Sequence, residues 1–240
     1  MTIFLFYFLA FFIYSVLGWI IEVIFVFIFT KKLLNRGFLI GPYCPIYGVA
    51  ALSMHFLLIE FIKYPFLIFI LAALLVVTIE FITSYVLEKV FKTRWWDYSQ
   101  LPFNIEGRVC LVHAILFGIL GLAFIYILDP KMMQILTNLS YNQMYIISII
   151  AFVIFIIDLF ISFNVIKKIT ATAEAIKKDN TAEINEKMKE ILLNQSYLTK
   201  RIILNFPNLK TLILQTKKKI KHTHSQIKEK INGYQKDSQK

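Results

Sequence analysis

Three acidic residues lie at matching positions inside long apolar stretches of this sequence. Glu22, Glu80 and Asp158 each stand nine residues before a lysine that follows the stretch. In a membrane helix, nine residues at 1.5 Å each place the carboxyl group roughly 13 Å inside the boundary. A charge at that depth costs about 2.5–3.5 kcal/mol, so such side chains face the bundle interior and pair. Two interpretations are open: a site for a proton, cation or substrate, or protonated acids that hydrogen-bond between helices.

Two of these acids share a predicted helix face with further small or polar residues. The two sets, each spaced at i, i+4 and i+8, are Tyr14, Gly18, Glu22 and Glu80, Ser84, Glu88. Residues four apart share one face of a helix, so the sets predict a common polar seam. Glycine also permits close helix packing in membranes, which is the competing interpretation of Gly18 and the preferred one for Gly118 with Gly121.

Two segments between apolar stretches hold most of the unusual residues. Residues 35–48 read NRGFLIGPYCPIYG and residues 94–110 read RWWDYSQLPFNIEGRVC. Glycine and proline at this density predict irregular backbone. The arginines could clamp an anionic phosphate or carboxylate, or pair with nearby acids instead. The candidate binding residues here are Asn35, Arg36, Glu88, Arg94, Asp97, Asn104 and Arg108, and the acids available for pairing are Glu88, Asp97 and Glu106.

Cys44, Cys110 and His113 carry side chains that can bind metals, but three candidates fall short of a tetrahedral structural site. Two cysteines are also too few for a disulfide framework. We interpret both as packing residues, and we expect neither a metal nor a cofactor.

The apolar composition indicates an integral membrane protein. Of the 240 residues, 58% are hydrophobic and 17% charged, against about 45–50% and 25% in soluble domains. A membrane span needs about 20 apolar residues, and four stretches qualify. The four are Ile3–Phe29, Phe66–Val90, Val109–Leu128 and Met144–Ile166, and a shorter fifth is Ile46–Ile62. We therefore expect an all-α polytopic membrane helix bundle of about five transmembrane helices.

The distribution of basic residues predicts the orientation. Lysine and arginine near span ends stay in the cytoplasm, and they cluster after the first, third and fifth spans. With five spans, the N-terminus outside and the C-terminus inside, every loop rich in lysine and arginine lies in the cytoplasm. The bundle would comprise residues 1–166. Residues 167–240, which hold 17 of the 26 Lys and Arg, would form a cytoplasmic helical tail.

The first four spans suggest an internal repeat. Residues 1–62 and 66–128 would be two parallel hairpins, followed by the fifth span at 143–166; chance similarity is the alternative. In the tail, the cluster Lys217, Lys218, Lys219 and Lys221 predicts contact with anionic lipid. No module for nucleic-acid binding is recognisable, so we expect no nucleic-acid partner.

Several motifs of the chain are similar to those of a known family. The runs YSVLGWIIE, NRGFLIGPYCPIYG, TSYVLEKVFKTRWWDYS, GRVCL and FGILG resemble the family described as putative ABC-transporter type IV, the CmpB-like putative permeases. The resemblance covers residues 4 to about 130, and RIILNFPNLKT at 201–211 extends it. It implies a permease-like component in a bacterial inner membrane, working with a separate ATP-binding subunit. No catalytic residues can be carried over, and we favour a protein that is not an enzyme.

Some features limit the functional interpretation. The chain contains no G-x-x-x-x-G-K-[ST] phosphate loop, and an EAA-like coupling motif is not apparent. Five spans are few for a translocation path, so a homodimer is an open option. The leading hypothesis is a transporter component. The alternatives are a membrane-embedded enzyme acting on a lipid or lipid-linked substrate, and an assembly or regulatory factor that binds through its tail.

Overall fold

The computed structural model describes residues 2–31, 33, 35, 37–92 and 94–178. It divides into two compact units: Met1–Val90 with Arg94–Asn164, and Phe91–Thr93 with Val165–Lys240. Arg36 and the tail beyond residue 178 lie outside the described residues. The expectations for an anion clamp at Arg36 and for lipid contact by the tail therefore stay predictions.

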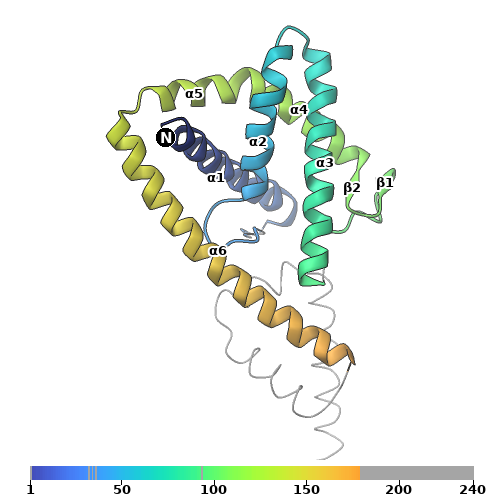
Figure 1. Ribbon diagram of the computed structural model, residues 1–240. Helices are drawn as coiled ribbons and strands as arrows, with labels where there is room; N and C mark the ends of the chain where they lie inside the picture. Colours follow the sequence, from blue (N-terminus) through green and yellow to red (C-terminus); the bar gives the residue numbers. More distant parts are fainter. Residues whose placement is uncertain (1, 32, 34, 36, 93, 179–240) are drawn as a thin grey trace, which may run out of the picture. The chain divides into compact units, whose positions relative to one another are not determined.

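The described chain is mostly helical, as predicted (Figure 1). In order, the helices are α1 (Thr2–Thr30), α2 (Pro45–Leu58), a 3-10 turn (Ile59–Phe61), α3 (Pro65–Phe91), α4 (Leu111–Ala123), a π-helical segment (Phe124–Leu128), α5 (Asp129–Thr137) and α6 (Tyr141–Lys178). Two short strands, β1 (Asn104–Ile105) and β2 (Val109–Cys110), pair antiparallel between α3 and α4.

Within the described residues, four helical stretches are long and apolar enough to cross a membrane. They are Ile3–Ile28, Pro65–Phe91, Leu111–Thr137 and Tyr141–Ala171. At most 22% of the most apolar window of each is buried inside the protein, so most of their surface is available to lipid. The predicted helical membrane fold is confirmed. The helix Pro45–Phe61 is apolar but shorter, and its role as a fifth span stays a prediction.

Helices α1 and α2 pack closely and supply much of the apolar core. The core cluster includes Leu9, Ala10 and Tyr14 from α1, Ala51, Met54 and Leu58 from α2, Ile68 and Ala72 from α3, and Phe124 and Ile125 from the π-helical segment. A Cβ atom at Gly18 would overlap the ring of Tyr47. Gly18 therefore brings α1 and α2 together, as the packing interpretation predicts.

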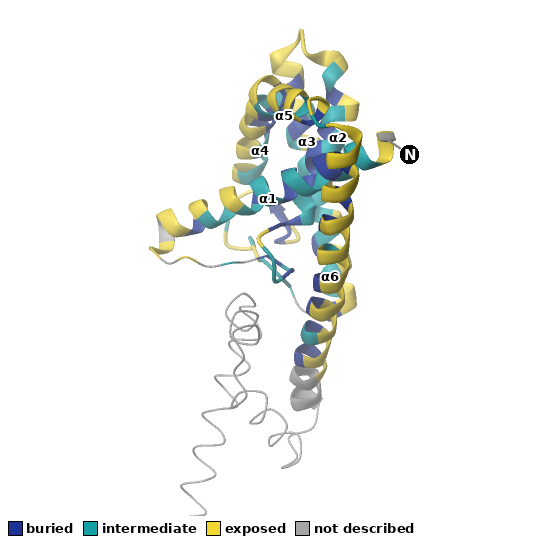
Figure 2. Ribbon diagram, turned by 90° about the vertical axis from the view of Figure 1, so that its left-hand side faces the viewer, coloured by how far each residue is buried: buried dark blue, intermediate teal, exposed yellow. Residues whose placement is uncertain are grey.

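Within the first unit, α6 buries one face and exposes the others (Figure 2). The buried positions are spaced three, four or seven residues apart, at Met144, Ser148, Ala151, Asp158 and Ser162. The hydroxyl of Ser148 donates to the carbonyl of Leu5 on α1 at 3.5 Å, and the rings of Phe155 and Phe11 meet edge to face. This single stripe presents Asp158 to the interior.

Candidate functional site

The loop between α1 and α2 is held by its own polar groups. The backbone N–H of Gly37 donates to Asn35 Oδ1 at 2.9 Å, and Asn35 Nδ2 donates to the carbonyl of Ile40 at 3.2 Å. At the end of the loop, the N–H of Cys44 donates to the carbonyl of Ser15 on α1 at 2.8 Å. Asn35 therefore shapes a turn in addition to any role in binding.

The carboxylate of Asp158 binds this loop. It accepts the backbone N–H groups of Ile40 at 2.9 Å and Gly41 at 2.7 Å, the hydroxyl of Tyr43 at 2.5 Å, and the hydroxyl of Ser162 at 2.8 Å. Burial, followed by the hydrogen bond to Asp158, raises the pKa of the Tyr43 hydroxyl, so Tyr43 remains a donor. Four hydrogen bonds satisfy a carboxylate in the protein interior, so Asp158 already has a structural task.

The other two acids meet in a second place, the Glu22–Glu80 cluster, formed by Glu22, Cys44, Tyr47, Glu80 and Tyr98. Glu80 is 7% exposed, and its Oε1 accepts the hydroxyl of Tyr98 at 3.2 Å. Glu22 lies close enough to interact electrostatically with Glu80 and Tyr47, and its Oε2 lies 3.8 Å from Cys44 Sγ. Helices α1, α2 and α3 and both loops contribute to this cluster, which unites two of the predicted site residues.

One atom of the cluster has no partner. Among the residues that the structure describes, Glu80 Oε2 is buried and accepts no hydrogen bond, and the indole Nε1 of Trp19 is likewise buried without an acceptor. A buried polar atom left unsatisfied costs about 1–3 kcal/mol. Such atoms in a native protein call for an explanation, and an absent ion, water or ligand is a frequent one.

A thiol–imidazole pair adjoins the cluster. The ring of Tyr98 stacks on His113 with centroids 4.4 Å apart, and His113 Nδ1 lies 3.0 Å from Cys110 Sγ. Burial, followed by the proximity of Glu80, raises the pKa of the Tyr98 hydroxyl, which therefore donates to Glu80 over the physiological range. Within the described residues, no group of three or more His, Cys, Asp and Glu side chains is arranged to hold a metal ion.

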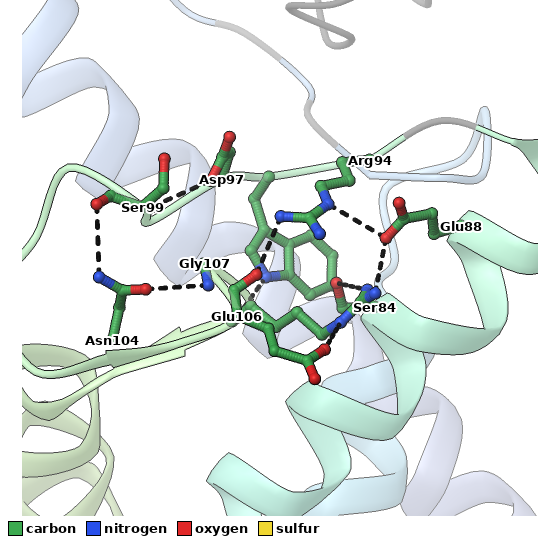
Figure 3. Close-up of polar contacts among 10 residues, drawn as sticks. Ser84, Glu88, Arg94, Asp97, Ser99, Asn104, Glu106 and Gly107 are labelled. Carbon is green, nitrogen blue, oxygen red and sulfur yellow. Dashed lines mark hydrogen bonds and ion pairs between the residues drawn. The ribbon is translucent and has the colours of Figure 1, made fainter.

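The second loop is anchored by a network of arginines and glutamates (Figure 3). Glu88 Oε2 accepts Arg94 Nε at 3.1 Å and Arg108 Nη2 at 2.7 Å. Arg108 also donates to Glu106 at 3.1 Å and to the Ser84 hydroxyl at 3.3 Å. Arg94 and Arg108 therefore pair with acidic residues of the protein, which was one of the two interpretations of the arginines. A lipid-processing groove lined with unpaired arginines gains no support from these two.

Asp97 and Asn104 order the backbone of the same loop. Asp97 Oδ1 accepts the N–H of Ser99 at 2.9 Å, a bond that lowers the pKa of the Asp97 carboxyl. Asn104 Oδ1 accepts the N–H of Gly107 at 3.0 Å. Gly107 has φ +66°, and a Cβ there would lie 2.6 Å from Asp97 Oδ1, so only glycine fits this position without strain. Figure 3 shows these contacts beside the arginine network.

Tyr14, the remaining predicted site residue, lies in another polar group. Its hydroxyl donates to Asp129 Oδ1 at 2.6 Å, and Asp129 Oδ2 lies 2.8 Å from His55 Nδ1. The sequence interpretation missed Asp129, because the fourth span was ended at Leu128 and Asp-Pro reads as a turn. The helical stretch continues to Thr137. The signal available in the sequence was that Asp129 and His55 are polar residues beside or within apolar stretches.

Comparison with known proteins adds one match. A model of the family described as "Putative ABC-transporter type IV" matches residues 9–163. No curated protein and no solved structure matches the chain. The matched range contains both loops, Glu22, Glu80 and Asp158.

Proposed function

We propose that this chain, which belongs to the putative ABC-transporter type IV family, is a permease-like component of a membrane transporter whose ion or solute site is the Glu22–Glu80 cluster. Membership of the family and four apolar helices make it a multi-pass, transporter-like membrane protein. The finer assignment rests on the chemistry of the cluster.

The observation that carries the proposal is the buried, unpartnered Oε2 of Glu80 beside a second carboxyl group, Glu22. Two nearby carboxylates in a medium of low dielectric constant do not both ionise without compensation. Within the described residues, no basic side chain forms an ion pair with Glu80. A proton or a cation is therefore the ligand that the buried Glu80 carboxyl group favours.

The surroundings of the cluster support a site that exchanges its ligand. Tyr98 from the second loop donates to Glu80, and Cys44 from the first loop contacts Glu22, so each loop contacts one of the two acids. The positive-inside distribution favours a cytoplasmic position for these loops and for the C-terminus. An ATP-binding subunit on another chain would supply energy to any ATP-driven step, and a homodimer would supply further helices for a path.

Flux through liposomes tests the proposal. Purified protein is reconstituted with a trapped pH-sensitive dye, and proton movement is measured under an imposed pH gradient and membrane potential. The Glu22→Gln/Glu80→Gln variant is expected to lose most of the protein-dependent flux, at least about tenfold, because it cannot exchange a proton between the two acids.

The matched control is Glu60→Gln, which changes an exposed carboxyl group in the 3-10 turn after α2. The control should retain wild-type flux. Equal flux in the double variant and the wild type would rule out the Glu22–Glu80 cluster as the transport site.

A further inference from the structure

Three polar side chains from three separate helices meet in the apolar core, at a place distinct from the Glu22–Glu80 cluster. They are Tyr14 of α1, His55 of α2 and Asp129 of α5. Asp129 is 1% exposed; one carboxylate oxygen accepts the Tyr14 hydroxyl at 2.6 Å, and the other lies 2.8 Å from His55 Nδ1. Tyr14 belongs to the core cluster and is itself 3% exposed. The group is therefore a complete hydrogen-bonded unit, the Tyr14–His55–Asp129 triad.

The net charge of the triad depends on a single proton. With an ionised aspartate and a neutral histidine, the triad carries one negative charge in the core. One added proton, on either the imidazole or the carboxylate, makes the net charge zero. A buried uncompensated charge is strongly unfavourable, so the presence or absence of this one proton decides whether the core holds a net charge.

The identity of the basic residue makes the proton exchangeable. Lysine or arginine beside Asp129 would compensate it permanently. Histidine, in contrast, gains and loses its proton between about pH 5 and pH 8 when unperturbed. Its side chain keeps 17% of its surface exposed, against 2% for Asp129, so the imidazole is the more accessible member through which a proton can enter.

The groups around the triad do not supply a competing charge. From α1, the Tyr7 ring lies 5.8 Å from the His55 ring; from α2, the Phe56 ring lies 5.2 Å from it. From the π-helical segment, the Phe124 ring packs edge to face on Tyr14. Lys131 on α5 and Glu60 on the 3-10 turn are exposed. In the part of the chain that the structure describes, His55 is the sole basic side chain paired with Asp129.

The triad and the Glu22–Glu80 cluster occupy different levels of α1. Tyr14 and Glu22 are eight residues apart on this helix, which corresponds to about 12 Å. Directly before Asp129, the helix adopts the π form, in which the N–H of Asp129 donates to the carbonyl of Phe124 five residues earlier. π-helical turns are frequent at functional sites, and this one ends directly at the carboxylate of the triad.

We propose that Tyr14, His55 and Asp129 form a binding site for one exchangeable proton, separate from the Glu22–Glu80 cluster. Asp129 carries the compensating charge, His55 exchanges the proton, and Tyr14 positions the carboxylate by donating to it. The site does not depend on the proposed function, because proton binding is defined without transport.

The test uses the full-length protein in lipid nanodiscs with ¹⁵N-labelled histidine. Magnetic resonance spectra recorded between about pH 5 and pH 9, a range that spans histidine titration, report whether each ring is an imidazolium. The His55 signal is assigned by its absence in His55→Gln, and His113→Gln serves as the matched variant at the other described histidine. Infrared difference spectra over the same range report any carboxylic-acid form of Asp129.

The expected result is a proton on the triad at low pH, seen on His55 or on Asp129, that is released at high pH. Asp129→Asn, which keeps the size and hydrogen-bonding capacity of the side chain, should weaken proton binding by His55 at least about tenfold. His113→Gln should leave the His55 signal unchanged.

Two results would overturn the proposal: a neutral His55 beside an ionised Asp129 at every pH, or a proton retained at every pH. Both describe a structural hydrogen-bond group that exchanges nothing. Because the spectra involve no flux, failure of this proposal and failure of the transport proposal are distinguishable.

Discussion

The Asp158 carboxylate accepts the backbone N–H of Ile40, 118 residues earlier in the chain, at 2.9 Å. Together with the bonds to Gly41 and Tyr43, it fixes the first loop to the last apolar helix. The same loop leads directly to Cys44, which contacts Glu22. Asp158 is therefore connected to the Glu22–Glu80 cluster through the loop it holds, and its own hydrogen-bond partners are Ile40, Gly41, Tyr43 and Ser162.

Asp158→Ala should release the first loop. The variant leaves two backbone N–H groups and two hydroxyls without their acceptor, and each such loss costs about 1–3 kcal/mol when the group stays buried. Since Cys44 is 9% exposed, we expect its reaction with a small maleimide to accelerate at least about tenfold, which corresponds to about 1.4 kcal/mol of easier local opening.

The internal control is Cys110, 3% exposed, whose reaction rate should not change. Ser162→Ala removes one of the four bonds and should give an intermediate rate. Unaltered Cys44 labelling in Asp158→Ala would show that the loop is held by other contacts.

Glu88→Gln should destabilise the second loop more than Glu106→Gln does. Glu88 Oε2 serves both Arg94 and Arg108, and the Arg108 side chain is 7% exposed, so removing the charge leaves a buried guanidinium poorly compensated. We expect a loss of about 1–3 kcal/mol. Glu106 is 61% exposed, and its contribution should fall within about 0–1 kcal/mol. Thermal unfolding in detergent compares the two, and an equal loss would contradict the ranking.

Gly18→Ala should separate α1 from α2 locally. The new Cβ would overlap the Cβ and Cγ atoms of Tyr47, and no side-chain rotation moves the Cβ atom away. Overpacking of this kind costs about 1–3 kcal/mol. Gly18→Ala/Tyr47→Gly removes both overlapping atoms, so a stability closer to that of Tyr47→Gly alone is expected. If Gly18→Ala alone leaves the unfolding temperature unchanged, the close approach at this position is not a constraint.

Tyr98 should ionise later than an ordinary tyrosine. Its pKa is raised in the folded protein above an unfolded value of about 10. The resulting stabilisation is complete below about pH 10 and is lost as the pH rises toward the folded-state pKa. Tyr98→Phe should therefore leave the tyrosinate absorbance of the folded protein unchanged up to about pH 10, while the two denatured proteins differ by one tyrosine. An earlier folded-state difference of one tyrosinate would refute the burial of this hydroxyl.

Much of the fold follows from the sequence, because lipid selects long apolar helices. The four long spans, the short Ile46–Ile62 stretch and the irregular loops were all predictable. The end of the fourth span was not: Asp129 and Pro130 resemble a turn, yet Pro130 fits the first turn of α5, where its missing N–H is tolerated. Helical structure therefore continues to Thr137.

The candidate site was predictable in part. Regular spacing from the lysines indicated that Glu22 and Glu80 lie at one level, and both occur in one cluster. The spacing did not show that Asp158 binds backbone N–H groups, because a contact with an irregular loop produces no periodic pattern in the sequence. Helical spacing placed Tyr14 on the stripe of Glu22, but its partner Asp129 is 115 residues away, and no local pattern reveals such a pairing.

The bond between Asp158 and the first loop also has a consequence for the order of synthesis. The N–H groups of Ile40 and Gly41 leave the ribosome long before their acceptor exists. At about 5–20 residues per second, the 118 residues between Ile40 and Asp158 take roughly 6–24 s to make. Until α6 has been made, the first loop lacks the carboxylate that holds it, so the loop can close only after Asp158 has been synthesised.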